Sequence, residues 1–167
     1  EAIHPNNIKR VIRALEYFQS TGQKFSDHNK EERQKGSPYN FLYLVLTMNR
    51  KVLYERIDKR VDQMMEEGLV KEVKQLLDAG YSRNLVSMQG LGYKEIASAL
   101  FKECTMEEAV YRLKRDTRHF AKRQMTWFRR ERDVTMINKD NFSNNHDIVN
   151  YIMKLAVEKG ICSCREG

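Results

Sequence analysis

Arg56 and Arg60 stand four residues apart in a stretch whose apolar residues recur at helical spacing, and Gln63 continues the same face. Two guanidinium groups placed in this way can hold a phosphate through paired hydrogen bonds. The same side chains could instead pair with Asp58 or with acids elsewhere in the chain. The spacing therefore indicates an anion site, and it leaves the choice between a ligand and the protein's own carboxylates open.

A second group of cations follows a long helix predicted over 106–131. Like charges three or four residues apart destabilise a helix, and the phosphates of a nucleic acid would neutralise them. A solvated surface helix is the simpler alternative. The excess of arginine, which suits phosphate, and the presence of His119, Thr126 and Trp127 favour nucleic acid. The basic residues are Arg112, Lys114, Arg115, Arg118, Lys122, Arg123, Arg129, Arg130 and Arg132.

The segment Gln89-Gly90-Leu91-Gly92-Tyr93-Lys94 is the third candidate. Its two glycines allow a backbone to approach a ligand closely, and the start of the helix behind them favours anions. Tyr93 could stack on a base. An ordinary turn from loop to helix explains the same pattern. The segment is not a phosphate-binding P-loop, because no GxxxxGK(S/T) sequence occurs in the 167 residues.

The cysteines give no disulfide framework, because there are only three. We therefore expect the chain to reside in a reducing cytoplasm. Cys162 and Cys164 could bind a metal ion, but two thiols without histidine partners are more often free. The four histidines show no spacing typical of metal ligands. We therefore predict no metal site in the chain.

With 2 prolines and 8 glycines the chain has few helix breakers, so we expect a predominantly helical fold. The first helix should begin near Asn7 and end at Gly22 in the left-handed conformation. It carries Lys9, Arg10 and Arg13 beside an apolar stripe, although short basic clusters near a helix start are common. Residues 23–38 are polar, and we expect a loop and a domain boundary there. The stripe consists of Ile8, Val11, Leu15 and Phe18.

Residues 39–48 are almost continuously apolar and predict a strand buried on both faces, as in a parallel sheet. Residues 134–137 are a weaker strand candidate. Two strands do not make a stable sheet alone, so we expect further strands from sequence outside this chain. The predicted helices are 50–66, 69–79, 93–103, 106–131 and 146–158. An inward seam of the longest helix is predicted to contain Val110, Leu113, Thr117, Phe120, Gln124 and Trp127.

The net charge of +7 favours a polyanionic partner, and 41% hydrophobic residues indicate a folded chain. No apolar run approaches the roughly 20 residues needed to cross a membrane. The chain starts at Glu1 without an initiator methionine, and we expect it to be a fragment of a longer protein.

Four motifs in series resemble the tRNA dimethylallyltransferase family, also called the isopentenyl-pyrophosphate transferases. The resemblance covers nearly the whole chain, and the motifs stand in the family's order. They lie at residues 3–16, 56–68, 89–95 and 121–129. The resemblance implies an α/β fold, with the C-terminal part of a P-loop NTPase-like core. Residues 1–38 would close a helical insertion domain, and residues 39–167 would return to the core with the long basic helix.

The reaction that the resemblance implies transfers a dimethylallyl group from dimethylallyl pyrophosphate to N6 of adenine 37, beside the tRNA anticodon. By similarity Arg60 is the catalytic residue, and Arg56 and Arg60 bind pyrophosphate. The partners implied are the tRNA anticodon stem-loop and dimethylallyl pyrophosphate, with Mg²⁺ as cofactor and a cytoplasmic monomer as the full-length form. The residues that correspond to tRNA contacts are Lys9, Arg10, Val11, Ile12, Arg13, Gln89, Gly90, Leu91, Gly92, Tyr93, Lys94, Lys122, Arg123, Gln124, Met125, Thr126, Trp127, Phe128 and Arg129.

The family's P-loop and its general-base aspartate have no counterpart in these residues. We therefore expect the chain to be inactive by itself. Two alternatives stay open: a non-catalytic helical RNA-binding module, and half of another P-loop enzyme such as a nucleotide kinase.

Overall fold

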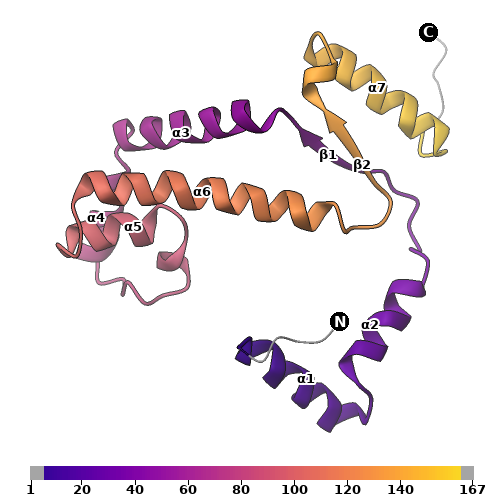
Figure 1. The fold of residues 1–167 in the computed structure, drawn as a ribbon, viewed down its shortest axis with the longest axis horizontal. Coiled ribbons are helices and arrows are strands. Elements are labelled where there is room, and N and C mark those ends of the chain that lie inside the picture. The colour runs from indigo at the N-terminus through magenta and orange to yellow at the C-terminus, as the bar shows by residue number, and fades with distance from the viewer. Residues whose placement is uncertain (1–5, 163–167) are drawn as a thin grey trace. The chain divides into compact units, whose positions relative to one another are not determined.

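The structure is a computed structural model that describes residues 6–162 (Figure 1). The chain divides into two compact units, with the division between Phe41 and Leu42. That division lies close to the boundary expected after residue 38. The assignment of the first unit to a helical insertion domain stays a prediction.

Helix α1 (Ile8–Thr21) has the predicted ends. The Asn7 side chain accepts a hydrogen bond from the Arg10 backbone N–H. At the other end Gly22, at φ 71°, donates its backbone N–H to the Phe18 carbonyl. Helix α1 carries the predicted apolar stripe, which includes Leu15 and Phe18, but no residue of α1 is buried.

The loop predicted over 23–38 is wrong, because helix α2 (Phe25–Gln34) occupies most of it. The Phe25 ring packs edge-on against Tyr17, with 5.4 Å between ring centroids. Asp27 lies in the first turn, where the helix dipole favours a negative charge. Apart from Phe25 the segment is polar, so it has no apolar periodicity for a sequence pattern to reveal.

The helices of the second unit agree closely with the prediction. Their core contains Val73, Ile96 and Leu113 among its most buried side chains. Helices α3 and α6 run side by side across it (Figure 1). The elements are α3 (Arg50–Glu66), α4 (Leu69–Asp78), the short 3₁₀ helix η1 (Ser87–Gln89), α5 (Tyr93–Leu100) and α6 (Met106–Phe128).

The inward seam predicted for α6 is only half right. Leu113 is buried, but Phe120 is 44% exposed and Trp127 is 54% exposed. The buried core residues of α6 end at Leu113, although the helix continues for four more turns. Periodicity finds a stripe along a helix, but it does not show how far the neighbouring elements cover that stripe.

Strands β1 (Tyr43–Thr47) and β2 (Val134–Asn138) pair in parallel, with Tyr43 opposite Val134. The strand predicted over 39–48 is therefore too long. Burial on both faces is also wrong for the described residues, because Val45 is buried whereas Leu46 is 54% exposed. The 3₁₀ helix η2 (Lys139–Asn141) and α7 (Asn145–Glu158) follow, and the Asn144 side chain caps α7. The expected further strands stay a prediction.

The fold is thus mostly helical α/β, as the sequence predicted. Within residues 6–162, no helix is both long enough and apolar enough to span a membrane.

Candidate functional site

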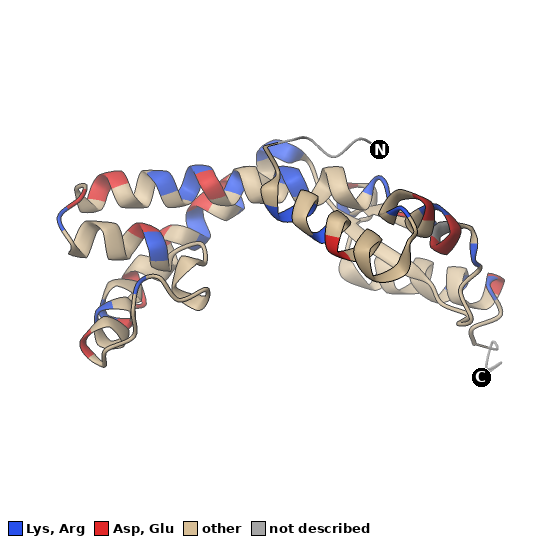
Figure 2. Ribbon diagram, turned by 90° about the horizontal axis from the view of Figure 1, so that it is seen from below, with Lys and Arg blue, Asp and Glu red and all other residues tan. Residues whose placement is uncertain are grey.

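The cations of α6 fall into two groups that differ in their surroundings. In the first part of the helix each of four basic side chains pairs with a carboxylate. Figure 2 shows basic and acidic segments close together on the helices of this unit. These four cations are already neutralised and need no polyanion. The pairs are Arg112–Glu108 (2.5 Å), Lys114–Asp62 (2.6 Å), Arg115–Asp116 (2.8 Å) and Arg118–Asp58 (2.5 Å).

In the second part of α6 and just beyond it, the described residues offer no acid to Lys122, Arg123, Arg129 or Arg130. All four side chains are exposed. The Arg123 guanidinium lies 5.7 Å from the centre of the Phe120 ring. Among the described residues, the basic stripe that the sequence indicated is therefore an unneutralised surface at Lys122, Arg123, Arg129 and Arg130.

This part of α6 also forms a shallow groove of about 410 Å³, here called the Trp127 groove. Unpaired cations suit phosphates, and an exposed indole is a platform on which an unstacked base can lie. The groove therefore combines the two kinds of contact that single-stranded nucleic acids make with proteins. It is lined by His119, Lys122, Arg123, Thr126, Trp127 and Arg130.

Two other residues of the α6 motif are less available. Met125 and Phe128 are half-buried, and the Phe128 ring meets Tyr43 of β1 edge-on at 6.4 Å. Phe128 therefore anchors the end of α6 to the sheet, whereas Gln124 is exposed.

Arg56 and Arg60 lie on an exposed face of α3. Neither has an acidic partner among the described residues. Asp58 pairs with Arg118 instead, so the alternative in which it neutralises the arginine pair does not occur. Two unpaired guanidinium groups one helical turn apart are suited to a di-anion such as pyrophosphate.

The segment from Gln89 to Lys94 is more tightly packed than a loop open to a ligand. Gly92, at φ 99°, donates its backbone N–H to Glu95 Oε2 over 2.9 Å. The Tyr93 hydroxyl donates to the Glu72 carboxylate, and this bond, with some burial, raises the pKa of Tyr93. Gln89 donates from Nε2 to the Arg83 carbonyl over 2.6 Å.

The groups of this segment that a ligand can reach are few. Gln89 and Gly90 are exposed, and Lys94 is half-buried. Leu91 is half-buried and Gly92 is buried, and Tyr93 packs against the core.

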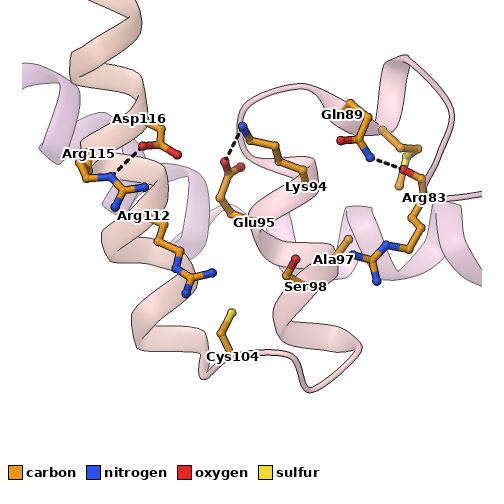
Figure 3. A pocket seen from close by; sticks show the side chains of 11 residues that line it. Arg83, Gln89, Lys94, Glu95, Ala97, Ser98, Cys104, Arg112, Arg115 and Asp116 are labelled. Carbon is orange, nitrogen blue, oxygen red and sulfur yellow. Dashed lines mark hydrogen bonds and ion pairs between the residues drawn. The ribbon is translucent and has the colours of Figure 1, made fainter. Parts of the chain in front are cut away.

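Gln89 and Lys94 belong to a cavity of about 530 Å³ between α5, α6 and the segment before α5 (Figure 3). Four cations line it, and each has a carboxylate partner. Arg83 pairs with Glu103, and its hydrogen bond lowers the pKa of that carboxyl. The Arg115 hydrogen bond likewise lowers the pKa of Asp116. The structure therefore does not bring Gln89 and Lys94 together with the Trp127 groove.

Glu95 is a structural residue of this cavity that the sequence analysis missed. Its side chain is only 4% exposed, and it caps α5 while Lys94 Nζ lies 3.4 Å from Oε1. The signal was present, because a glutamate three residues after an N-cap position is typical of a capping box.

The candidate residues of α1 lie in the first unit. Lys9, Arg10, Ile12 and Arg13 are exposed, and Val11 is half-buried.

Among residues 6–162 no cluster of three or more His, Cys, Asp or Glu side chains could hold a metal ion. Cys104 and Cys162 are free thiols, and Cys164 lies outside the described residues.

The family model for the IPP transferases matches residues 1–131, more than three quarters of the chain. This chain belongs to the IPP transferase family. It is 58% identical to the tRNA dimethylallyltransferase of Lachnoclostridium phytofermentans over 161 residues, 96% of this chain and 51% of that protein. It is 52% identical to the tRNA dimethylallyltransferase of Acetivibrio thermocellus, over 89% of this chain and 48% of that protein.

Two solved structures agree. The full-length tRNA isopentenylpyrophosphate transferase of Bacillus halodurans is 45% identical, with a TM-score of 0.70, over 95% of this chain and 48% of that one. The tRNA delta(2)-isopentenylpyrophosphate transferase of Staphylococcus epidermidis is 40% identical, with a TM-score of 0.65, over 91% of this chain and 50% of that one. The chain spans about half the length of these relatives.

Proposed function

We propose that this chain provides the RNA-gripping surface and the pyrophosphate arginines of a tRNA dimethylallyltransferase. The enzyme would transfer a dimethylallyl group from dimethylallyl pyrophosphate to N6 of adenine 37, beside the anticodon. The observation that carries the proposal is the unneutralised second part of α6, where Lys122, Arg123 and Arg130 surround the exposed Trp127. Membership of the IPP transferase family supports the choice of RNA as the polyanion.

The chemistry assigns a task to Arg56 and Arg60. During transfer the carbon–oxygen bond to pyrophosphate breaks, a carbon–nitrogen bond forms, and the amine loses a proton to a base. Negative charge grows on the leaving pyrophosphate. Fixed guanidinium groups stabilise such a charge in the transition state. The two arginines are exposed and have no acidic partner among the described residues, so they are available for this task.

The RNA must also change shape. An adenine stacked in the anticodon loop cannot reach a prenyl donor, so it has to be flipped out of the stack. Proteins hold such loops through basic contacts to the backbone and through stacking on aromatic rings. Lys122 and Arg123 would bind phosphates, and Trp127 would support an unstacked base.

Mg²⁺ is expected for a pyrophosphate-releasing transferase, and among residues 6–162 no cluster of three or more His, Cys, Asp or Glu side chains could hold it. Mg²⁺ is usually bound through one or two carboxylates together with the phosphates of the substrate. No step at this chain's residues is assigned to the metal.

The chain contains no P-loop sequence, and we propose that its 167 residues do not catalyse the transfer alone. Incubation with an anticodon stem-loop RNA and dimethylallyl pyrophosphate should leave the adenine unmodified, while the RNA is still bound. Prenylated adenine in a nuclease digest would overturn the proposed inactivity. Absence of binding would overturn the RNA-gripping role.

The role of Arg60 is tested in a full-length transferase that contains this chain. Arg60→Ala should lower kcat by roughly 10²–10³-fold, because one transition-state donor is removed. The affinity for RNA should change less than about threefold, since α3 is not assigned an RNA contact. Lys59→Ala, on the same helix, is the matched control and should retain turnover. An unchanged kcat in the Arg60 variant would contradict the catalytic role.

A further inference from the structure

Two ion pairs join α3 to α6. Arg118 Nη1 lies 2.5 Å from Asp58 Oδ1, and Lys114 Nζ lies 2.6 Å from Asp62 Oδ1. The acids are four residues apart on α3, and the bases are four residues apart on α6 in the opposite order. The two pairs therefore form consecutive rungs between antiparallel helices (Figure 1). The set Asp58, Asp62, Lys114 and Arg118 is called the interhelical ladder below.

Together with the burial of Val61 in the core, the ladder sets the rotation of α3 about its own axis. An α-helix turns by about 100° per residue. Arg56 and Arg60 each stand two residues from Asp58, so they point about 200° around the helix from it. With the aspartates held against α6, the arginine pair is held on the far flank, where both side chains are exposed.

The ladder also keeps four charges from competing with the site. Asp58 stands two residues from each arginine and therefore lies on another face of α3. It pairs with Arg118, whose side chain is half-buried at 23% exposure. Both arginines therefore keep their charge available for a ligand.

We infer that Asp58 and Asp62 are positioning residues that, through Arg118 and Lys114, hold Arg56 and Arg60 toward pyrophosphate. This inference rests on the proposed function, in which that arginine pair binds the leaving group. The aspartates touch neither substrate nor pyrophosphate themselves. Their effect reaches the ligand through the orientation of α3.

A purely structural role makes a different prediction. Partly exposed ion pairs contribute little to folding, so loss of the ladder should shift Tm by only a few degrees. A structural role would lower the folded fraction and leave the pyrophosphate affinity of the folded enzyme unchanged. A positioning role changes that affinity in enzyme that remains folded.

The experiment measures inhibition by inorganic pyrophosphate in a full-length transferase containing this chain. In the variant Asp58→Asn with Asp62→Asn, the inhibition constant should rise roughly tenfold, with the circular dichroism spectrum retained. Exchange of the charges in one rung, Asp58→Arg with Arg118→Asp, re-forms that pair in the opposite sense. It should restore most of the affinity for pyrophosphate that is lost with the ladder. Asp78→Asn breaks the Lys74–Asp78 pair within α4, at 2.8 Å, and is the matched control. It should leave the constant unchanged.

The same variants in an Arg60→Ala background separate the positioning role of the ladder from a purely structural role. If the ladder acts through the arginine pair, the aspartate changes add little once Arg60 is absent. The positioning role is overturned if Asp58→Asn with Asp62→Asn leaves the inhibition constant unchanged and Arg60→Ala still raises that constant. If Arg60→Ala alone leaves the constant unchanged, the assignment of pyrophosphate to α3 fails instead.

Discussion

Gly92 shows how a single residue shapes the candidate site. Its φ of 99° is a backbone conformation that residues with a side chain rarely adopt. A Cβ atom added there would meet Leu69 and Met64 at 3.8 and 3.9 Å, which is ordinary contact. The need for glycine is therefore conformational and not a matter of space.

We expect Gly92→Ala to lower the free energy of unfolding by about 1–3 kcal/mol, the cost of holding a residue in a strained backbone region. Gly36→Ala is the control, because a Cβ atom added at Gly36 would meet no atom within 4 Å and Gly36 has no positive φ. It should change stability by less than about 0.5 kcal/mol. Urea denaturation of both variants measures the difference, and equal midpoints would contradict the strain argument.

Asp116 gives a pH dependence whose sign can be worked out. The Arg115 hydrogen bond lowers the pKa of Asp116 in the folded protein below its ordinary 3.8. Such a group stabilises the fold above its unfolded pKa, and the contribution is lost as the pH falls through the lowered value. Asp116→Asn should therefore be less stable than the wild type at neutral pH, with the difference closing below pH 3.8.

Urea denaturation across the acid range checks this dependence. Arg115→Gln removes the cause of the shift and should give the same closing difference. A difference that stays constant with pH would show that the Arg115–Asp116 pair does not contribute through ionisation.

At the residue scale the spacing predicted that Arg56 and Arg60 share one face of α3, but it left open whether a ligand or the protein's own carboxylates pair with them. It could not predict the partner of Asp58. Arg118 is 60 positions away along the chain, and no local pattern connects two residues at that separation. The Lys114–Asp62 pair was hidden for the same reason, since Asp62 also lies on another helix. The Arg112–Glu108 and Arg115–Asp116 pairs are local to α6.

Helix α6 has two parts whose surroundings differ. Its first part is pinned to α3 and to the core, whereas its second part carries cations that no described acid neutralises. Every released counterion contributes to the salt dependence of nucleic-acid binding. The division therefore predicts which cations determine that dependence.

We expect Lys122→Ala and Arg123→Ala each to weaken RNA binding and to flatten its salt dependence. The logarithmic slope should fall by roughly 0.7–0.9 for each phosphate that the variant no longer neutralises. Lys114→Ala and Arg112→Ala, which remove cations already paired with acids, are the matched controls and should leave the slope unchanged. Titration at several salt concentrations measures both. Equal slopes for all four variants would contradict the division.

At the element scale the ends of helices were predictable, because caps are local. Asn7 and Gly22 mark the two ends of α1 in the sequence. Helix α2 was missed because its polar residues show no periodicity. The strand predicted at β1 was too long, because an apolar run shows where a strand can form and not how many of its residues pair with a neighbouring strand.

At the scale of the whole chain, the connection between the two units is the most accessible stretch. Residues 35–41 are exposed and lie outside helices and strands. Brief trypsin treatment should cut first after Lys35, because such segments are preferred sites of proteolysis. Mass spectrometry should then show a fragment that begins at Gly36 and resists further cleavage. First cuts within 69–128 would contradict this order.

The parallel pairing of β1 and β2 sets an order of events during folding. Tyr43 pairs with Val134, so the second strand is synthesised only after the whole helical part that lies between them. Closing so long a loop as a flexible chain costs much entropy. Once α3 and α6 have packed, their ends already hold the two strands near each other and that cost is largely met. We therefore expect the helices of this unit to fold first and the sheet to form last.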